Sequence, residues 1–141
     1  MKKAILFLVA ILSISYSNAQ EQKKNYHFNG ILESSGQIDE NNFPIGEWKY
    51  YSKEGDLNYE LNHTTNYSKE YYTTGKLKAE GTFNPLTGVH IKKWITYYKN
   101  GQIKTKGVFD ENGEKNGKFK TYFKNGTLDN IAIYKEGVKQ E

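Results

Sequence analysis

The sequence contains no cysteine and no arginine, and only two of its 141 residues are proline. Without cysteine, no disulfide can hold a fold together, so stability must come from packing and hydrogen bonds. Without arginine, the chain lacks the side chain that grips phosphate bidentately and reads guanine edges, so nucleic acid is not an expected partner. Aromatic residues, in contrast, make up 15% of the chain, a content too high for a disordered protein.

The N-terminal residues have the pattern of a secretory signal peptide. Lys2 and Lys3 precede an apolar run at 4–14, and Ser17-Asn18-Ala19 supplies the small residues of a cleavage site. The apolar run is shorter than the roughly 20 residues of a membrane span, although an uncleaved anchor is the alternative. We therefore expect residues 1–19 to be removed and residues 20–141 to be exported to the periplasm or outside the cell. After cleavage the protein would not be an integral membrane protein, and its formal charge would fall from +4 to +2.

The rest of the chain repeats one pattern four times around a central glycine. An aromatic residue stands seven positions before this glycine in three copies, and a tyrosine stands four before it in all four. Six positions after it comes a small residue in three copies, with Leu61 as the exception. The central glycines are Gly55, Gly75, Gly101 and Gly126; the aromatic residues are Trp48, Trp94 and Phe119, with Ser68 as the exception; the tyrosines are Tyr51, Tyr71, Tyr97 and Tyr122; the small residues are Gly81, Gly107 and Ala132.

This spacing predicts an all-β protein, an elongated single-layer array of antiparallel β-hairpins. Asn100-Gly101 and Asn125-Gly126, flanked by aromatic and β-branched residues, predict two-residue turns with positive φ. A glycine six residues later leaves room for a ring from a neighbouring strand. We expect repeat units at about 46–65, 66–91, 92–116 and 117–137, after a cap strand at about 26–34 and a looser stretch at 36–46, with a charged tail at 135–141.

The aromatic rings allow two interpretations. Because side chains alternate along a strand, rings lie on both faces of the array, and a single layer cannot bury all of them. Most would form a core over the glycines of adjacent hairpins. Alternatively, one row lines a shallow groove that binds a protein segment or a glycan. The best candidates for that binding surface are Tyr50, Tyr72, Tyr98 and Trp94.

The sequence offers no catalytic constellation. His27, His63 and His90 are far apart and have no metal-ligand spacing, so structural or surface roles are expected. No serine occupies a nucleophile elbow and no glycine-rich phosphate loop opens a helix. The acidic segment 110–114 could suggest calcium, but it lacks the alternation of a calcium loop and is better interpreted as a turn. We expect a non-enzymatic protein with no catalytic residue, no bound metal and no cofactor.

The repeated motif resembles the MORN repeat in its bacterial variant form. Gly46-Glu-Trp48-Lys-Tyr-Tyr51 and Gly117-Lys-Phe119-Lys-Thr-Tyr122 carry the resemblance, which extends over roughly residues 26–137. The second unit departs most, with Ser68 for the aromatic residue and Asn66 for the leading glycine, so it is either less well packed or presents a different surface.

The resemblance implies a β-hairpin array used for binding. Bacterial members are often labelled antitoxins, so another protein, a toxin being one candidate, is the first expected partner. Export argues against a cytosolic toxin but fits an immunity role against a toxin that acts in the envelope. Lipid binding has been proposed for some members, so the alternative partner is an envelope lipid or glycan.

Overall fold

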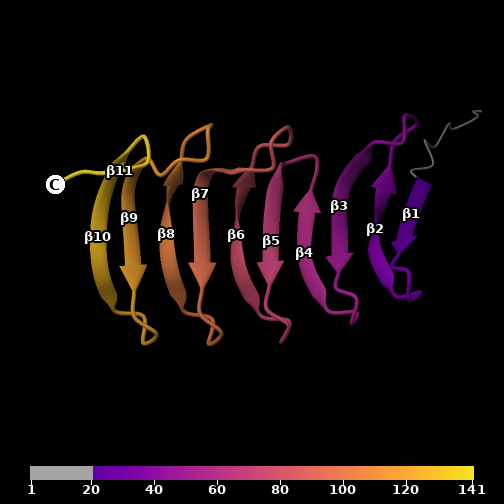
Figure 1. Cartoon of the computed structure of the whole chain (residues 1–141), viewed down its shortest axis with the longest axis horizontal. Coiled ribbons are helices and arrows are strands. Elements are labelled where there is room, and N and C mark those ends of the chain that lie inside the picture. Colours follow the sequence, from indigo (N-terminus) through magenta and orange to yellow (C-terminus); the bar gives the residue numbers. More distant parts are fainter. Residues whose placement is uncertain (1–20) are drawn as a thin grey trace, which may run out of the picture.

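The computed structural model describes residues 21–141, which form one antiparallel sheet of eleven strands and contain no helix. Each strand pairs with the next strand in the sequence, and Figure 1 shows them side by side along the long axis in a single layer. The expected all-β hairpin array is therefore confirmed. The strands are β1 (Glu21–Tyr26), β2 (Leu32–Ile38), β3 (Pro44–Tyr51), β4 (Leu57–Asn62), β5 (Tyr67–Tyr71), β6 (Leu77–Phe83), β7 (His90–Tyr97), β8 (Ile103–Phe109), β9 (Gly117–Tyr122), β10 (Leu128–Lys135) and β11 (Val138–Lys139).

The repeat glycines lie at the hairpin tips. At the β7–β8 tip, the Gly101 amide donates to the Tyr98 carbonyl and the Tyr98 amide donates to the Gln102 carbonyl, both at 2.8 Å. Gly101 has a φ of 88°, whereas Asn100 has no positive φ. The loop therefore contains three residues, and our expectation of a two-residue Asn-Gly turn is wrong, although the positive φ at glycine is correct. A turn followed by one left-handed residue requires positive φ only at the glycine.

The N-terminal segment forms a complete hairpin. β1 pairs with β2 from Glu21↔Ile38 to Tyr26↔Leu32, and the tip glycine, Gly30, has a φ of 82°. Gly30 is thus the centre of a fifth repeat, with Tyr26 four positions before it and Gly36 six after it. The expected single cap strand at 26–34 and looser stretch at 36–46 are wrong, because β2 continues to residue 38 and β3 begins at residue 44.

Two further boundaries differ from expectation. The division between the second and third units, placed at 91/92, falls inside β7, which begins at His90. The charged tail includes β11, which extends the sheet by pairing Tyr134 with Lys139 and Lys135 with Val138. The signal peptide expected at 1–19 lies outside the described residues. No helix within residues 21–141 has the length and hydropathy to cross a membrane.

The core of this thin sheet is built from rings that lie on glycine backbone. A Cβ atom at any of three strand glycines would overlap an aromatic ring on the next strand. Trp48 and Trp94 are consequently only 4% and 5% exposed. We call the row of side chains that contains these rings the ring row. The three covered pairs are Gly36–Trp48, Gly81–Trp94 and Gly107–Phe119.

The two faces of the sheet carry different side chains. We call the face that carries Trp48, Trp94 and Phe119 the ring face. Residues one position away along each strand, such as Lys93 and Lys118, project from the opposite face, which we call the lysine face.

Candidate functional site

The ring row is interrupted between β4 and β5. Along the ladder Trp48 pairs with Leu61, Leu61 with Ser68, and Ser68 with Gly81. We call the two facing positions of this row on the adjacent strands of neighbouring hairpins a cell. In the other cells a ring covers a glycine. In this one, Leu61 stands at the glycine position and Ser68 at the ring position. Leu61 and Ser68 together carry fewer side-chain atoms than the indole of Trp48 or Trp94, so this cell is incompletely filled.

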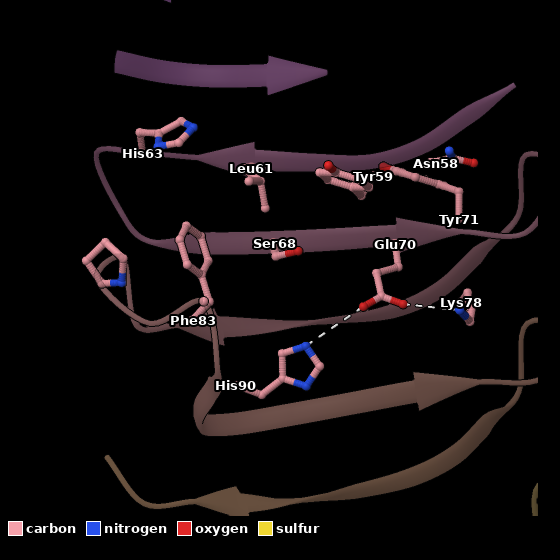
Figure 2. A pocket seen from close by; sticks show the side chains of 12 residues that line it. Asn58, Tyr59, Leu61, His63, Ser68, Glu70, Tyr71, Lys78, Phe83 and His90 are labelled. Carbon is pink, nitrogen blue, oxygen red and sulfur yellow. Dashed lines mark ion pairs between the residues drawn. The ribbon is translucent and has the colours of Figure 1, made fainter. Parts of the chain in front are cut away.

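A cavity of about 630 Å³ opens at this interruption. Figure 2 shows Leu61 and Ser68 between the rings of His63 and Phe83 on one side and Glu70 on the other, with His90 across from them. The volume lies within the range of roughly 300–1,000 Å³ that is usual for ligand pockets. We call it the Ser68 cavity. Its lining comes from β4 to β7 and their loops: Asn58, Tyr59, Leu61, His63, Ser68, Glu70, Tyr71, Lys78, Phe83, Pro85, Gly88 and His90.

Aromatic rings form much of the wall. His63 packs edge-on between Trp48 and Phe83, with ring centroids 6.4 Å and 6.5 Å apart. His90 stacks on Trp94, with centroids 3.6 Å apart and planes inclined by 14°. The structural roles expected for these two histidines agree with this packing. The cavity is therefore bounded by ring edges and faces, which favour a flat, apolar occupant.

Glu70 is the acidic group of the cavity. One carboxylate oxygen lies 3.3 Å from the Lys78 ammonium, and the other lies 3.8 Å from Nε2 of His90. Figure 2 draws both contacts as dashed lines. Burial lowers the pKa of His90 below its ordinary value, and the opposing effect of Glu70 is smaller. At neutral pH His90 is therefore uncharged, and Lys78 alone balances Glu70.

His63 contributes an unpaired polar atom. Its Nε2 is buried and has no hydrogen-bond partner among the described residues. Burial lowers the pKa of His63, so its ring is neutral at pH 7. Buried nitrogen atoms normally find a partner, so the hydrogen bonding of this wall is incomplete.

The same junction lacks the bonds that join other neighbouring hairpin tips. The Tyr72 hydroxyl donates to the Tyr97 carbonyl at 2.7 Å, and the Tyr98 hydroxyl donates to the Tyr122 carbonyl at 2.8 Å. Nε2 of His27 lies 3.0 Å from the Tyr51 carbonyl in the same way. The equivalent position in the hairpin before the cavity is Ser52, whose hydroxyl instead accepts from amides of its own turn.

The four residues expected on a binding surface have different environments. Trp94 is 5% exposed, so its expected accessibility is wrong; the ring is held over Gly81. Tyr72 and Tyr98 are half-buried and use their hydroxyls in the bonds between hairpins just described. Tyr50 lies on the ring face, half-buried and stacked on Tyr59 with centroids 4.5 Å apart. Sequence reasoning missed the cavity, but Ser68 and Leu61, the exceptions at the ring and glycine positions of the repeat, mark it.

The repeat tyrosines lie on the lysine face. The Tyr71 hydroxyl donates to Glu60 at 2.6 Å, and the Tyr97 hydroxyl donates to Glu80. Burial raises the pKa of both phenols, and the hydrogen bonds to the carboxylates raise it further. Glu60 also lies 3.6 Å from Lys49 and 3.9 Å from Lys69. These tyrosines therefore belong to a polar network within the sheet.

Toward the C-terminal end, the lysine face carries lysines together with exposed aliphatic side chains. Four lysines, which make no ion pair among residues 21–141, surround exposed aliphatic side chains there. We call this surface the lysine patch. It consists of Lys93, Lys106, Lys118 and Lys120 with Val108, Ile131 and Ile133.

Within the described part of the chain, no group of three histidine, cysteine or acidic residues is placed to hold a metal ion. In the acidic segment 110–114, the Asp110 carboxylate accepts hydrogen bonds from the amides of Asn112 and Glu114, each at 3.0 Å. The segment therefore forms a turn held by the Asp110 side chain, as its sequence indicated.

The repeat geometry agrees with comparison to known families. The family model described as MORN repeat variant matches residues 44–64, 65–84, 92–111 and 115–136, which together are more than half of the chain. The protein belongs to this family, and a binding role is consistent with that membership. The hairpin centred on Gly30 lies outside the matched residues. No curated protein and no solved structure matches the chain significantly.

Proposed function

We propose that this protein is an exported, non-enzymatic binding module that recognises another protein through the ring face at the Ser68 cavity. The interruption of the ring row carries the proposal. A repeat array that only supported itself would fill this cell with a ring, as the Gly36–Trp48 and Gly81–Trp94 cells are filled. Instead it leaves an open cavity lined by aromatic rings, a carboxylate and a lysine.

The test is affinity capture from the envelope fraction of the parent organism. The purified protein is the bait, and a double variant, Leu61→Gly with Ser68→Trp, is the matched control because it recreates the glycine–ring pair. We expect one stoichiometric protein bound to the parent and lost from the variant. Retention of lipid or glycan with no protein would contradict the proposal.

Within this function, an immunity role against a toxin that acts in the envelope is the sharpest version. It is supported by the family's frequent antitoxin label together with the expected export. The expected result is that deleting the gene makes cells sensitive to a toxin encoded beside it. A deletion strain that grows normally while expressing that toxin would exclude this role but leave protein binding intact.

The lysine patch supports a second candidate, binding to an anionic envelope lipid or glycan. Lys118 and Lys120 stand beside exposed Ile131 and Ile133. The ammonium groups suit anionic headgroups, and the isoleucines suit the apolar layer beneath them. Binding to anionic vesicles should weaken steeply with salt. Lys118→Glu with Lys120→Glu should abolish it, whereas Lys23→Glu with Lys24→Glu, at the far end of the sheet, should not. Absence of vesicle binding at low salt would rule this candidate out.

A further inference from the structure

We propose that the Ser68 cavity receives the indole ring of a tryptophan from the partner protein, which completes the ring row from outside. This inference rests on the proposed protein-binding function and names the side chain that is recognised. The incompletely filled cell lies between two cells of the same row whose rings are Trp48 and Trp94.

The cavity is large enough for an indole. The ring positions on either side of it are filled by indoles that lie on the sheet backbone. At about 630 Å³ the cavity holds such a ring together with part of the main chain that carries it. Ser68 is small and only 7% exposed, and the rings of Phe83 and His90 line the cavity beside it. An incoming ring would contact their edges and faces, the geometry that aromatic pairs prefer.

The charges of the cavity select a neutral group that donates a hydrogen bond. Glu70 and Lys78 are the charged pair of the lining, and they balance each other at 3.3 Å. A charged side chain would leave one uncompensated charge in a half-buried site, which is costly. An indole is neutral, and its N–H can donate to Glu70, whose side chain is 31% exposed. In the first cell the same group of Trp48 donates to the Gln37 carbonyl at 2.8 Å.

The junction also leaves access for the ring. Tyr72 and Tyr98 tie their hairpins to the next ones, but Ser52 makes no such bond from the hairpin that precedes the cavity. β4 and β5 are held together by ladder pairs from Tyr59↔Glu70 to Asn62↔Tyr67. Small adjustments between the two hairpins can therefore admit an indole without breaking a hydrogen bond between hairpin tips.

The experiment is a titration of the isotope-labelled protein with N-acetyl-L-tryptophanamide, followed by nuclear magnetic resonance. We expect saturable shifts of the Ser68 and Phe83 amides and of the His90 imidazole, with a dissociation constant on the order of 1 mM for so small a probe. N-acetyl-L-leucinamide should bind at least about tenfold more weakly, because it lacks the ring and its donor. Absence of saturable shifts at these residues, or equal binding of the leucine compound, would overturn the proposal.

Two variants sharpen the result. Leu61→Gly with Ser68→Trp fills the cell with the protein's own indole and should reduce probe binding by at least about tenfold. Lys69→Trp adds an indole at the neighbouring position on the lysine face and should leave binding unchanged. Unchanged binding in a folded double variant would overturn the proposal. The titration of the unmodified protein decides the question by itself if the double variant does not fold.

Failure of this inference can be distinguished from failure of the proposed function. If the bait captures one protein, but the captured protein binds parent and double variant equally, then the binding function stands and indole recognition is wrong. If no protein is captured at all while the probe binds at Ser68, indole recognition by the cavity stands and the proposed binding of an envelope protein is wrong.

Discussion

The indole of Trp94 lies directly on the backbone of Gly81, its partner across the β6–β7 ladder. A Cβ atom at Gly81 would overlap the ring and would also approach the Lys93 carbonyl oxygen to 2.6 Å. The relationship explains both the low exposure of Trp94 and the requirement for glycine in the middle of a strand, where glycine is otherwise unfavourable.

Replacing Gly81 with valine should therefore destabilise the protein. The new side chain has to displace Trp94 from a well-packed position, and overpacking of this kind costs about 1–3 kcal/mol. Urea unfolding monitored by tryptophan fluorescence measures the loss. Thr82→Val is the matched control, because it introduces the same side chain at the adjacent position on the opposite face. Equal midpoints for parent and Gly81→Val would show that the ring does not cover the glycine.

The loss of stability on replacing Gly101 should depend on the backbone preference of the new residue, whereas at Gly81 it depends on the space that the side chain needs. Its φ is 88°, but a Cβ there would have no neighbour within 4 Å, so the cost of substitution is backbone strain alone. Gly101→Val should lose about 1–3 kcal/mol, because a β-branched residue resists this conformation. Gly101→Asn should lose clearly less, because asparagine tolerates it. Thermal and urea unfolding of both variants test the prediction, which is wrong if their losses are equal.

Removing the Tyr98 hydroxyl should weaken the join between neighbouring hairpins. The hydroxyl donates to the Tyr122 carbonyl at 2.8 Å, and loss of such a bond typically costs about 0.5–1.5 kcal/mol. Urea unfolding of Tyr98→Phe measures this cost. Tyr26→Phe is the control, since Tyr26 is 58% exposed and its hydroxyl makes no hydrogen bond among the described residues. If both variants unfold like the parent, Tyr98 contributes nothing through its hydroxyl and is free to serve a partner.

The local features of the repeat could be predicted from the sequence because each depends on a few neighbouring residues. A glycine at a tip has to accept positive φ, and a glycine six positions later has to leave space for a ring. The loop length at the tip could not be predicted, because Asn-Gly suits both a two-residue turn and a three-residue loop. The structure has the latter, in which Asn100 instead donates from its side chain to the Lys124 carbonyl at 2.7 Å.

The fifth hairpin was hidden because Lys23 stands where three of the other four repeats have a ring. A search on Tyr26, Gly30 and Gly36, with the spacings of the other repeats, would have found it. The hydroxyl bonds between hairpins were also missed. They join residues 24 or 25 positions apart, as from Tyr98 to Tyr122, and only the stacking of whole hairpins brings them together.

The candidate site was only half visible in the sequence. Ser68 and Leu61 stand out as exceptions, and together they predict either a poorly packed unit or a different surface. Which of the two applies depends on residues far along the chain. Phe83, Pro85 and His90 close the cavity from the end of β6 and the start of β7, and their positions follow from the β6–β7 loop, which no local pattern specifies.

Tyr71 and Tyr97 should make the protein sensitive to alkaline conditions. Burial, followed by hydrogen bonds to Glu60 and Glu80, raises the pKa of both phenols above that of an unfolded tyrosine. The folded protein therefore keeps these protons at a pH where the unfolded chain releases them. Their contribution to stability is fully present below about pH 10, the ordinary tyrosine pKa, and is lost as the pH rises above it.

The measurement compares the free energy of unfolding near pH 8 and near pH 11 for the parent and for Tyr71→Phe with Tyr97→Phe. We expect the double variant to be less stable than the parent near pH 8, because it lacks two hydrogen bonds to carboxylates. Between the two pH values it should lose less stability than the parent, because the two titrating phenols are gone. Equal slopes for parent and double variant would show that the phenols on Glu60 and Glu80 titrate like unfolded tyrosines.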